Sequence, residues 1–253
     1  MNVIFACGHD LGAVTDNVKA AAHKHWMLQL FLCAAGEMEI SVAGVGVRCR
    51  GIIVDMNTAH QFGTSGRAHL TMLIDPVSAL GRRLSRQYIN GQRFYVLPDE
   101  LAHTLQNKLS ELLDNINAQT LGGLIGQIHQ AFENEAKGHV LDDRVRDVIR
   151  LIEECPCKEK HRLASLAQAV ALSESRLAHL FKEKTGVPLK SYLVLHELHK
   201  AYAVLAEGGS VTDAAMAAGF DSPSHLAYTN RKMTGMSASG IIKDSEFLKV
   251  LIP

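Results

Sequence analysis

The 253-residue sequence lacks the features that would place a protein in a membrane or outside the cell. No apolar run approaches the roughly 20 residues that a membrane-spanning helix needs. The N-terminus, MNVIFACGHDLG, has no basic start and reaches Asp10 early, so it does not resemble a signal peptide. We therefore expect a cytoplasmic protein without a membrane partner.

A disulfide framework is also missing. The cysteines are odd in number and irregularly spaced, which argues against one in a chain without an export signal. They are Cys7, Cys33, Cys49, Cys155 and Cys157. There is no phosphate-binding glycine loop and no convincing combination of nucleophile and base. We therefore predict that the chain is not an enzyme.

The sequence has no excess of charge of either sign. Residues 1–140 contain 11 Lys and Arg against 12 Asp and Glu, and residues 141–253 contain 15 against 14. Neither part is strongly basic. Any binding of nucleic acid must therefore come from a local patch and not from bulk charge.

The apolar pattern divides the chain into two parts. Over about residues 1–80, brief runs of β-forming residues are broken by glycines, which predicts a meander of hairpins in a sandwich or small barrel. Over about residues 81–136 the period becomes helical. From residue 141 to the end everything reads as helix. We therefore predict an α+β chain with two domains, 1–140 and 141–253.

Within the first domain, one predicted helix carries a regular leucine stripe. Residues 100–116 place five leucines on one face. These are Leu101, Leu105, Leu109, Leu112 and Leu113. The stripe could pack on its own sheet or form the seam of a homodimer, because periodicity alone does not assign a partner.

The second domain contains the same short unit twice. LASLAQAVALSESRLAHLFKEKTG (about 163–186) aligns with VTDAAMAAGFDSPSHLAYTNRKMTG (about 211–235), with one extra residue in the second turn. Each reads as helix, turn and helix, with Ser173 and Ser222 as N-caps of the second helices and Gly186 and Gly235 as C-terminal stops. Ser210 and Asp213 could cap the first helix of the second unit.

The two units suit the helix-turn-helix geometry, in which the second helix enters the major groove of DNA. A predicted helix over about residues 189–206 joins them and should be about 25–30 Å long. Such a strut could place two recognition helices about one DNA turn apart, near 34 Å. One chain could then contact successive major grooves of double-stranded DNA without a partner.

Over about residues 142–244 the order and spacing of these segments resemble the AraC/XylS family of transcriptional regulators. The resemblance implies two helix-turn-helix subdomains, bridged by one helix, that bind promoter DNA; RNA polymerase is a further candidate partner. Carried onto this chain, it predicts groove-facing side chains on two helices. In the first they are Glu174, Ser175, Arg176, His179, Lys182 and Lys184. In the second they are Ser222, Ser224, His225, Tyr228, Thr229, Arg231 and Lys232.

The second unit departs from the family pattern. Asn230 occupies the core position that Phe181 has in the first unit, and Thr229 stands opposite Leu180. A polar residue at a core site costs stability unless it finds a partner. We therefore expect the first unit to carry most of the sequence specificity.

Four residues of the first domain could bind a metal ion. In order and spacing, His23, His25, Gln29 and His60 resemble the metal-binding pattern of cupin barrels, and AraC-type regulators commonly carry a cupin-like sensor domain. On one strand, residues 23, 25 and 29 would share a face. Imidazole nitrogens suit divalent transition metals, and Gln29 would be a weak fourth ligand. The alternative is that these histidines are polar rim residues of a degenerate pocket.

The sequence CPCKEKH (155–161) is a weaker candidate for a soft metal, because its cysteines do not have the usual CxxC spacing. We favour a surface turn there. Trp26, the single tryptophan, should lie in the core or at an interface.

The favoured function is a transcriptional regulator whose promoter binding responds to an unknown small-molecule or metal effector, or to dimerisation, through the cupin-like domain. Two alternatives remain. A metal-dependent cupin enzyme would need a redox metal and a polar substrate pocket. An interaction protein that has lost DNA contact would explain the altered second unit, but not the retained Arg176, Lys182 and Lys184.

Overall fold

The short apolar runs at the start of the chain form two β-sheets in the computed structural model, which describes residues 1–133, 141–154, 162–234 and 245–250. Below, the N-terminal region is residues 1–133 and the helical region is residues 141–234. The strands are β1 (Asn2–Cys7), β2 (Asp10–Thr15), β3 (Lys19–His23), β4 (Leu28–Cys33), β5 (Met38–Val42), β6 (Val45–Cys49), β7 (Gly51–Val54), β8 (His60–Gly63), β9 (His69–Ile74), β10 (Phe94–Val96) and β11 (Glu246–Val250).

The two sheets form the predicted sandwich. One has the strand order β10-β7-β4-β9-β2-β1-β11 and the other β3-β8-β5-β6. Apolar side chains from both sheets meet between them, including Phe31, Ile40, Ile52 and Phe62. Burying these side chains contributes about 1.5–3 kcal/mol for each large one.

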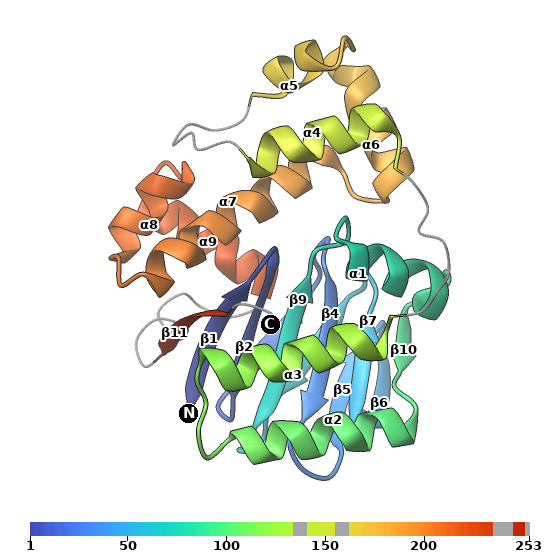
Figure 1. Cartoon of the computed structure of the whole chain (residues 1–253), viewed down its shortest axis with the longest axis vertical. Helices are drawn as coiled ribbons and strands as arrows, with labels where there is room; N and C mark the ends of the chain where they lie inside the picture. Colours follow the sequence, from blue (N-terminus) through green and yellow to red (C-terminus); the bar gives the residue numbers. More distant parts are fainter. Residues whose placement is uncertain (134–140, 155–161, 235–244, 251–253) are drawn as a thin grey trace.

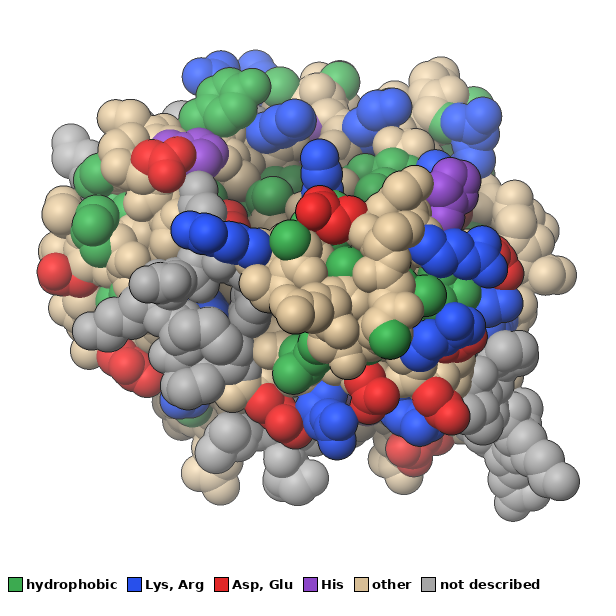
Figure 2. All heavy atoms as spheres, turned by 90° about the horizontal axis from the view of Figure 1, so that it is seen from above, with side chains coloured by type: hydrophobic (Ala, Val, Ile, Leu, Met, Phe, Trp, Pro, Cys, Tyr) green, Lys and Arg blue, Asp and Glu red, His purple; other side chains and the backbone are tan. Residues whose placement is uncertain are grey.

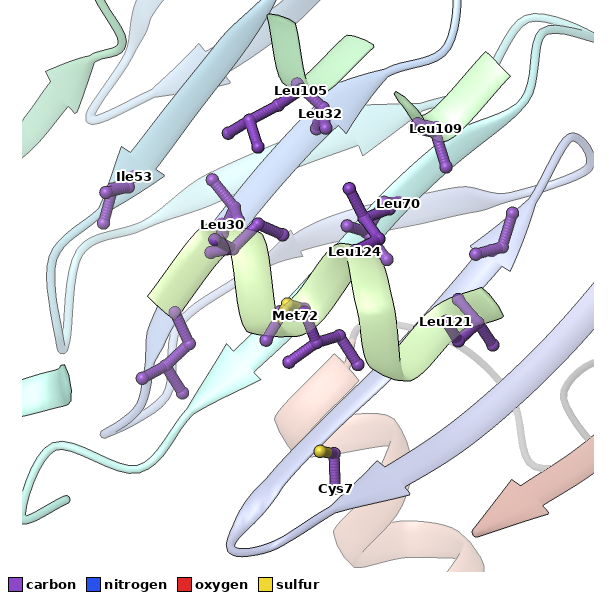
Figure 3. Close-up of a cluster of buried hydrophobic side chains, with 14 of the residues drawn as sticks. Cys7, Leu30, Leu32, Ile53, Leu70, Met72, Leu105, Leu109, Leu121 and Leu124 are labelled. Carbon is purple, nitrogen blue, oxygen red and sulfur yellow. The ribbon is translucent and has the colours of Figure 1, made fainter. Parts of the chain in front are cut away.

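Helices cover the outer face of the larger sheet (Figure 1). They are α1 (Ala79–Arg83), a π-helical turn η1 (Leu84–Ile89), α2 (Asp99–Leu112) and α3 (Ala118–Ala131). Figure 3 shows Leu105 and Leu109 of α2 together with Leu121 and Leu124 of α3 over Leu30, Leu70 and Met72 of the sheet.

The leucine stripe of α2 therefore packs on its own sheet. Leu105, Leu109 and Leu112 are buried in that core, and Leu101 and Leu113 pack against it partly buried. This confirms the first of the two interpretations. The second, a dimer seam, stays a prediction, since Leu101 and Leu113 are only partly covered within the chain.

The helical region follows the predicted order. Its helices are α4 (Asp143–Glu153), α5 (Leu163–Ala169), α6 (Glu174–Thr185), α7 (Leu189–Ala206), α8 (Val211–Ala218) and α9 (Pro223–Thr234). Two small cores hold it together, one around Leu177 and Phe181 and the other around Ala215 and Leu226. The α+β fold class is confirmed. None of the helices in the described part of the chain combines the length and hydropathy that spanning a bilayer requires.

Two strands lie where the sequence predicted helix. β10 pairs antiparallel with β7, and β11 pairs parallel with β1, Val3 opposite Glu246. The helical expectation was wrong at both places because each strand is short and its partner is distant in sequence. β11 lies beside β1 at the edge of the larger sheet (Figure 1).

The N-terminal and helical regions pack against each other. α7 lies against β1 and β11, and α9 contacts β3. Trp26 packs, partly buried, against the core around Phe181, which agrees with the predicted interface position. The predicted domain boundary, between residues 140 and 141, lies at the edge of a segment outside the described residues.

Candidate nucleic-acid interface and ligand cavity

The first repeat unit forms a helix, a turn and a second helix whose ends are fixed by the predicted caps. Ser173 Oγ accepts a hydrogen bond from the Arg176 backbone N–H (3.3 Å), and Gly186 ends α6 in the left-handed conformation with φ of 79°. Leu177, Leu180 and Phe181 are buried against α4, α5 and α7. The opposite face of α6 is therefore turned outward.

All six residues predicted for the first recognition helix are exposed: Glu174, Ser175, Arg176, His179, Lys182 and Lys184. Arg176, His179 and Lys182 follow at intervals of three residues, so they lie along one side of the helix. Lys184 pairs with Glu183 (2.7 Å), an exposed ion pair that phosphate could displace at little cost.

The basic side chains are grouped although the chain as a whole is neutral. Figure 2 looks onto the end of the molecule that carries the helical region, and Lys and Arg side chains follow one edge of this face with few Asp or Glu between them. A local patch of this kind is what phosphate contact requires.

The second unit places its predicted residues less uniformly. Ser224, Tyr228, Arg231 and Lys232 are exposed, Tyr228 at 67%. Ser222 and His225 are partly exposed, and Ser222 Oγ accepts the backbone N–H of His225 (3.1 Å) as the predicted cap. The prediction for Thr229 is wrong. This residue is buried, with 8% of its surface exposed, so its side chain does not face a DNA groove.

Asn230 is buried at the core position, and it has a partner. The Tyr202 hydroxyl donates a hydrogen bond to Asn230 Oδ1 (2.6 Å), which joins α7 to α9. The bond offsets part of the cost of burying the amide. The sequence identified the polar substitution but not the tyrosine that compensates it.

Some predicted positions cannot be placed. Gly235 and the whole CPCKEKH segment, with Cys155, Cys157 and His161, lie outside the described residues.

A cavity of about 390 Å³ lies where the second unit meets the N-terminal region. The N-terminal region contributes mainly apolar side chains, among them Ile4, Leu11, Phe31, Phe62 and Leu73. It also contributes Lys19, His23 and Gln29. The helical region contributes Tyr202, Arg231 and Thr234. Sequence reasoning missed Lys19, Tyr202 and Thr234 as cavity residues, because nothing local marks them.

The four predicted metal ligands do come together, but not on one strand. β3 ends at His23, His25 lies in the following loop, Gln29 is in β4 of the other sheet, and His60 begins β8. The prediction that residues 23, 25 and 29 share one strand was therefore wrong. The turn between β3 and β4 still brings one nitrogen of each histidine within 4.8 Å of the others.

Hydrogen bonds fix which nitrogens of the cluster are free. His23 Nδ1 donates to the carbonyl of Ala21 (2.8 Å), and His60 Nδ1 donates to the carbonyl of Thr58 (2.9 Å). A carbonyl can only accept, so both rings, when neutral, keep a lone pair on Nε2. Nδ1–H donated to a backbone carbonyl is also how metal-binding histidines are oriented.

Gln29 cannot satisfy both neighbouring histidines. His25 Nδ1 accepts the backbone N–H of Met27 (3.3 Å), so His25 Nε2 carries a hydrogen and donates to Gln29 Oε1 (2.9 Å). His60 Nε2 lies 2.8 Å from the same oxygen, with a lone pair of its own. If the Gln29 amide were turned over, its NH2 group could donate to His60 Nε2. It would then face the N–H of His25 Nε2, so two donors would oppose each other. A cation at this point would resolve it.

Burial keeps these imidazoles neutral. It lowers the pKa of His25 to about 3 and that of His60 to about 4, and it also lowers the pKa of His23. The neighbouring histidines lower the pKa values of His25 and His60 further. Neutral imidazole is the form that binds metal, so near pH 7 these histidines have the protonation state that metal binding requires.

Comparison with known proteins supports the helix-turn-helix interpretation of the repeated unit. A family model described as "Helix-turn-helix domain" matches residues 166–243. The arabinose operon regulatory protein of Salmonella typhimurium is 31% identical over 107 residues, a match that spans 42% of this chain but only 38% of the relative. The probable transcriptional regulator LumQ of Photobacterium leiognathi is 27% identical over 224 residues, covering 85% of this chain and 89% of LumQ.

The helix-turn-helix part of the chain is therefore similar to transcriptional regulators of the AraC/XylS type.

The fold of the whole chain is similar to that of a solved structure. An apo variant of ToxT from Vibrio cholerae superposes with a TM-score of 0.58 at 12% identity, covering 93% of this chain and 97% of ToxT. At that identity the likeness shows the shared fold alone. ToxT has also been solved with an unsaturated fatty acid bound, and that structure superposes with a TM-score of 0.53.

Proposed function

We propose that the chain is a sequence-specific regulator that binds promoter DNA through α6 and α9, and that a ligand in the cavity controls this binding. The observation that carries the proposal is the shared wall of the cavity. Strands of the N-terminal region form one side, and Tyr202 of α7 together with Arg231 and Thr234 of α9 form the other. A ligand bound there touches both regions and so favours one arrangement of the two.

The surrounding contacts support this coupling. Arg231 and Thr234 lie on α9, the predicted recognition helix of the second unit. Tyr202 lies on α7, which leads to that unit and holds Asn230 of α9 through its hydroxyl. A ligand that displaces Tyr202 or Arg231 therefore changes the position of α9.

The lining favours an apolar carboxylic acid as the effector. Phe31, Phe62 and Leu73 offer apolar surface, while Lys19 and Arg231 are cations. Neither cation forms an ion pair with a described acidic residue. A carboxylate could bind them while its chain fills the cavity, which agrees with the unsaturated fatty acid bound to ToxT.

The change Arg231→Gln should weaken binding of palmitoleate to the full chain by about 10- to 100-fold, because a charge-assisted hydrogen bond contributes about 1.5–3 kcal/mol. Binding would be measured by calorimetry. Lys232→Gln, on the same helix but outside the cavity wall, is the matched control and should change little. The alcohol of the same chain length should bind both proteins weakly. Equal affinities of the two variants for palmitoleate would remove Arg231 from the site.

A second candidate effector is a divalent transition metal. The geometry favours His23 Nε2, His60 Nε2 and Gln29 Oε1 as its ligands, with His25 donating to Gln29 from outside. His23 Nε2 is buried and has no hydrogen-bond partner among the described residues, which is the specific observation that supports this assignment. The oxygen of Gln29 is the weakest of these ligands, so we expect moderate affinity.

The change His60→Ala should abolish zinc binding at this cluster, whereas His25→Ala should weaken it by about 10- to 100-fold, as loss of a second-shell partner does. Zinc is titrated against a chromophoric chelator into metal-free full chain that also carries His9→Gln, so that zinc binding at His9, outside this cluster, does not contribute. His103→Ala, an exposed histidine on α2, is the control. Retention of the cluster's zinc by His60→Ala would contradict the assignment and leave these histidines as polar residues of the cavity wall.

The deciding experiment is selection of genomic fragments by purified full chain, with and without palmitoleate, with zinc and with chelator. A selected motif that spans two major grooves would indicate that both helix-turn-helix units bind DNA. A motif confined to one groove would assign sequence recognition to α6. Absence of any motif under all conditions would overturn the proposal and favour an interaction protein. In our proposal the chain has no catalytic role, and RNA polymerase and a second copy of the chain remain candidate partners.

A further inference from the structure

A second cluster of ligand-type side chains lies away from the cavity, where the N-terminal and helical regions meet. It consists of His9 in the β1–β2 turn, Asp75 directly after β9, and Glu153 at the end of α4. One ligand atom of each lies within 4.8 Å of the other two. His9 Nε2 is 3.7 Å from Glu153 Oε1.

The carboxylate of Asp75 is the most enclosed member of the cluster. Asp75 is 6% exposed, and its Oδ1 accepts the backbone N–H of Val77 (2.8 Å). Among the described residues, no Lys or Arg forms an ion pair with it. A charged carboxylate this deeply buried is costly unless a cation compensates it.

The surroundings hold these groups in place as the second shell of a metal site does. The Tyr192 hydroxyl donates to Glu153 Oε1 (3.1 Å), and Asp10 Oδ1 accepts the backbone N–H of Asp75 (2.9 Å). A hollow of about 10 Å³ beside His9 and Asp75 is about the size of one water or ion. His199 also borders the hollow, and its Nε2 is buried with no hydrogen-bond partner in the described part of the chain.

We propose that His9, Asp75 and Glu153 bind a divalent transition metal ion, with zinc as the best match, and that this ion links the N-terminal sheet to α4 of the helical region. One imidazole and two carboxylates are a ligand set that zinc accepts, and a fourth position is left for water or His199. Two ligands of a tetrahedral zinc lie about 3.3 Å apart. The 3.7 Å between His9 and Glu153 needs only a small adjustment.

Access and position both suit such an ion. The side chains of His9 and Glu153 are 45% and 27% exposed, so zinc can enter from solvent while Asp75 forms the floor. Because the ligands come from both regions, the bound ion stabilises the packed arrangement over any arrangement in which the regions separate.

The test uses full chain with the substitutions His23→Ala and His60→Ala, which remove the other histidine cluster. Zinc alone is titrated into the metal-free protein against a chromophoric chelator. We expect one zinc ion per chain and a higher thermal midpoint with zinc. His9→Gln, a change at a half-exposed residue that should not disturb folding, should weaken binding at least tenfold. Glu153→Gln should do the same, whereas its neighbour Glu154→Gln is the matched control and should bind like the parent protein.

Three results would overturn the proposal: no zinc bound by the parent protein, equal zinc affinity in His9→Gln and Glu154→Gln, or magnesium binding as tightly as zinc. Cobalt gives an independent reading, since its visible spectrum should show tetrahedral nitrogen and oxygen ligation in the parent and lose it in His9→Gln. No DNA and no fatty acid are present, so failure here leaves the proposed regulatory function untouched.

Discussion

The change Phe181→Ala should lower the free energy of unfolding of the first helix-turn-helix unit by about 3–5 kcal/mol. Phe181 is fully buried in the core beneath α6, and its ring centre lies 5.3 Å from that of Tyr192 on α7. Removing the ring leaves a cavity that the surrounding helices can close only in part. Because this core holds the recognition helix, specific DNA binding should be lost together with stability.

Urea unfolding followed by circular dichroism would measure the change, with DNA binding assayed in parallel. His179→Ala, on the exposed face of the same helix, is the control and should alter stability by less than about 0.5 kcal/mol. If Phe181→Ala left both the unfolding midpoint and DNA affinity unchanged, α6 would not depend on this core for its position.

The sequence predicted this part of the fold well because its signals are local. Caps such as Ser173 and Gly186 and the helical period of Leu177, Leu180 and Phe181 all lie within a few residues of the structure that they specify. The same reasoning placed Asn230 in the second core. It could not find Tyr202, since a hydrogen bond between α7 and α9 depends on tertiary packing.

The change Arg176→Ala should weaken binding to the cognate site by about 1–3 kcal/mol, which is about 5- to 150-fold, and relax the choice of base there. Arg176 is exposed near the N-terminus of α6, where recognition helices contact base edges, and its guanidinium can pair with guanine at two atoms. For Lys184, near the other end of α6, we predict a contact with a DNA phosphate.

The comparison with Lys184→Ala makes this prediction specific. That change should weaken binding to all DNA alike and lower the dependence of affinity on salt concentration. Affinities of both variants would be measured on the selected site, on single-base variants of it and on unrelated DNA, at several salt concentrations. Equal losses on every DNA for both variants would remove Arg176 as a base reader.

The ligand sites were less predictable than the helices. The order of His23, His25, Gln29 and His60 identified the first cluster, although the chain reaches it through a loop and two sheets. His9, Asp75 and Glu153 gave no such signal, because they are far apart in sequence and meet only where two regions pack. The cavity was not predictable either, since its wall combines β-strands with α7 and α9.

The parallel pairing of β11 with β1 has a consequence for synthesis of the protein. Asn2 and Ser245, which are hydrogen-bonded across this edge, are separated by 243 positions, so the larger sheet stays incomplete until the helical region has been translated. In the meantime β1 presents an open edge, which invites pairing with other chains. Such a distant contact also slows folding. Removal of residues 245–250, which contain only the short strand β11, should therefore promote aggregation during expression.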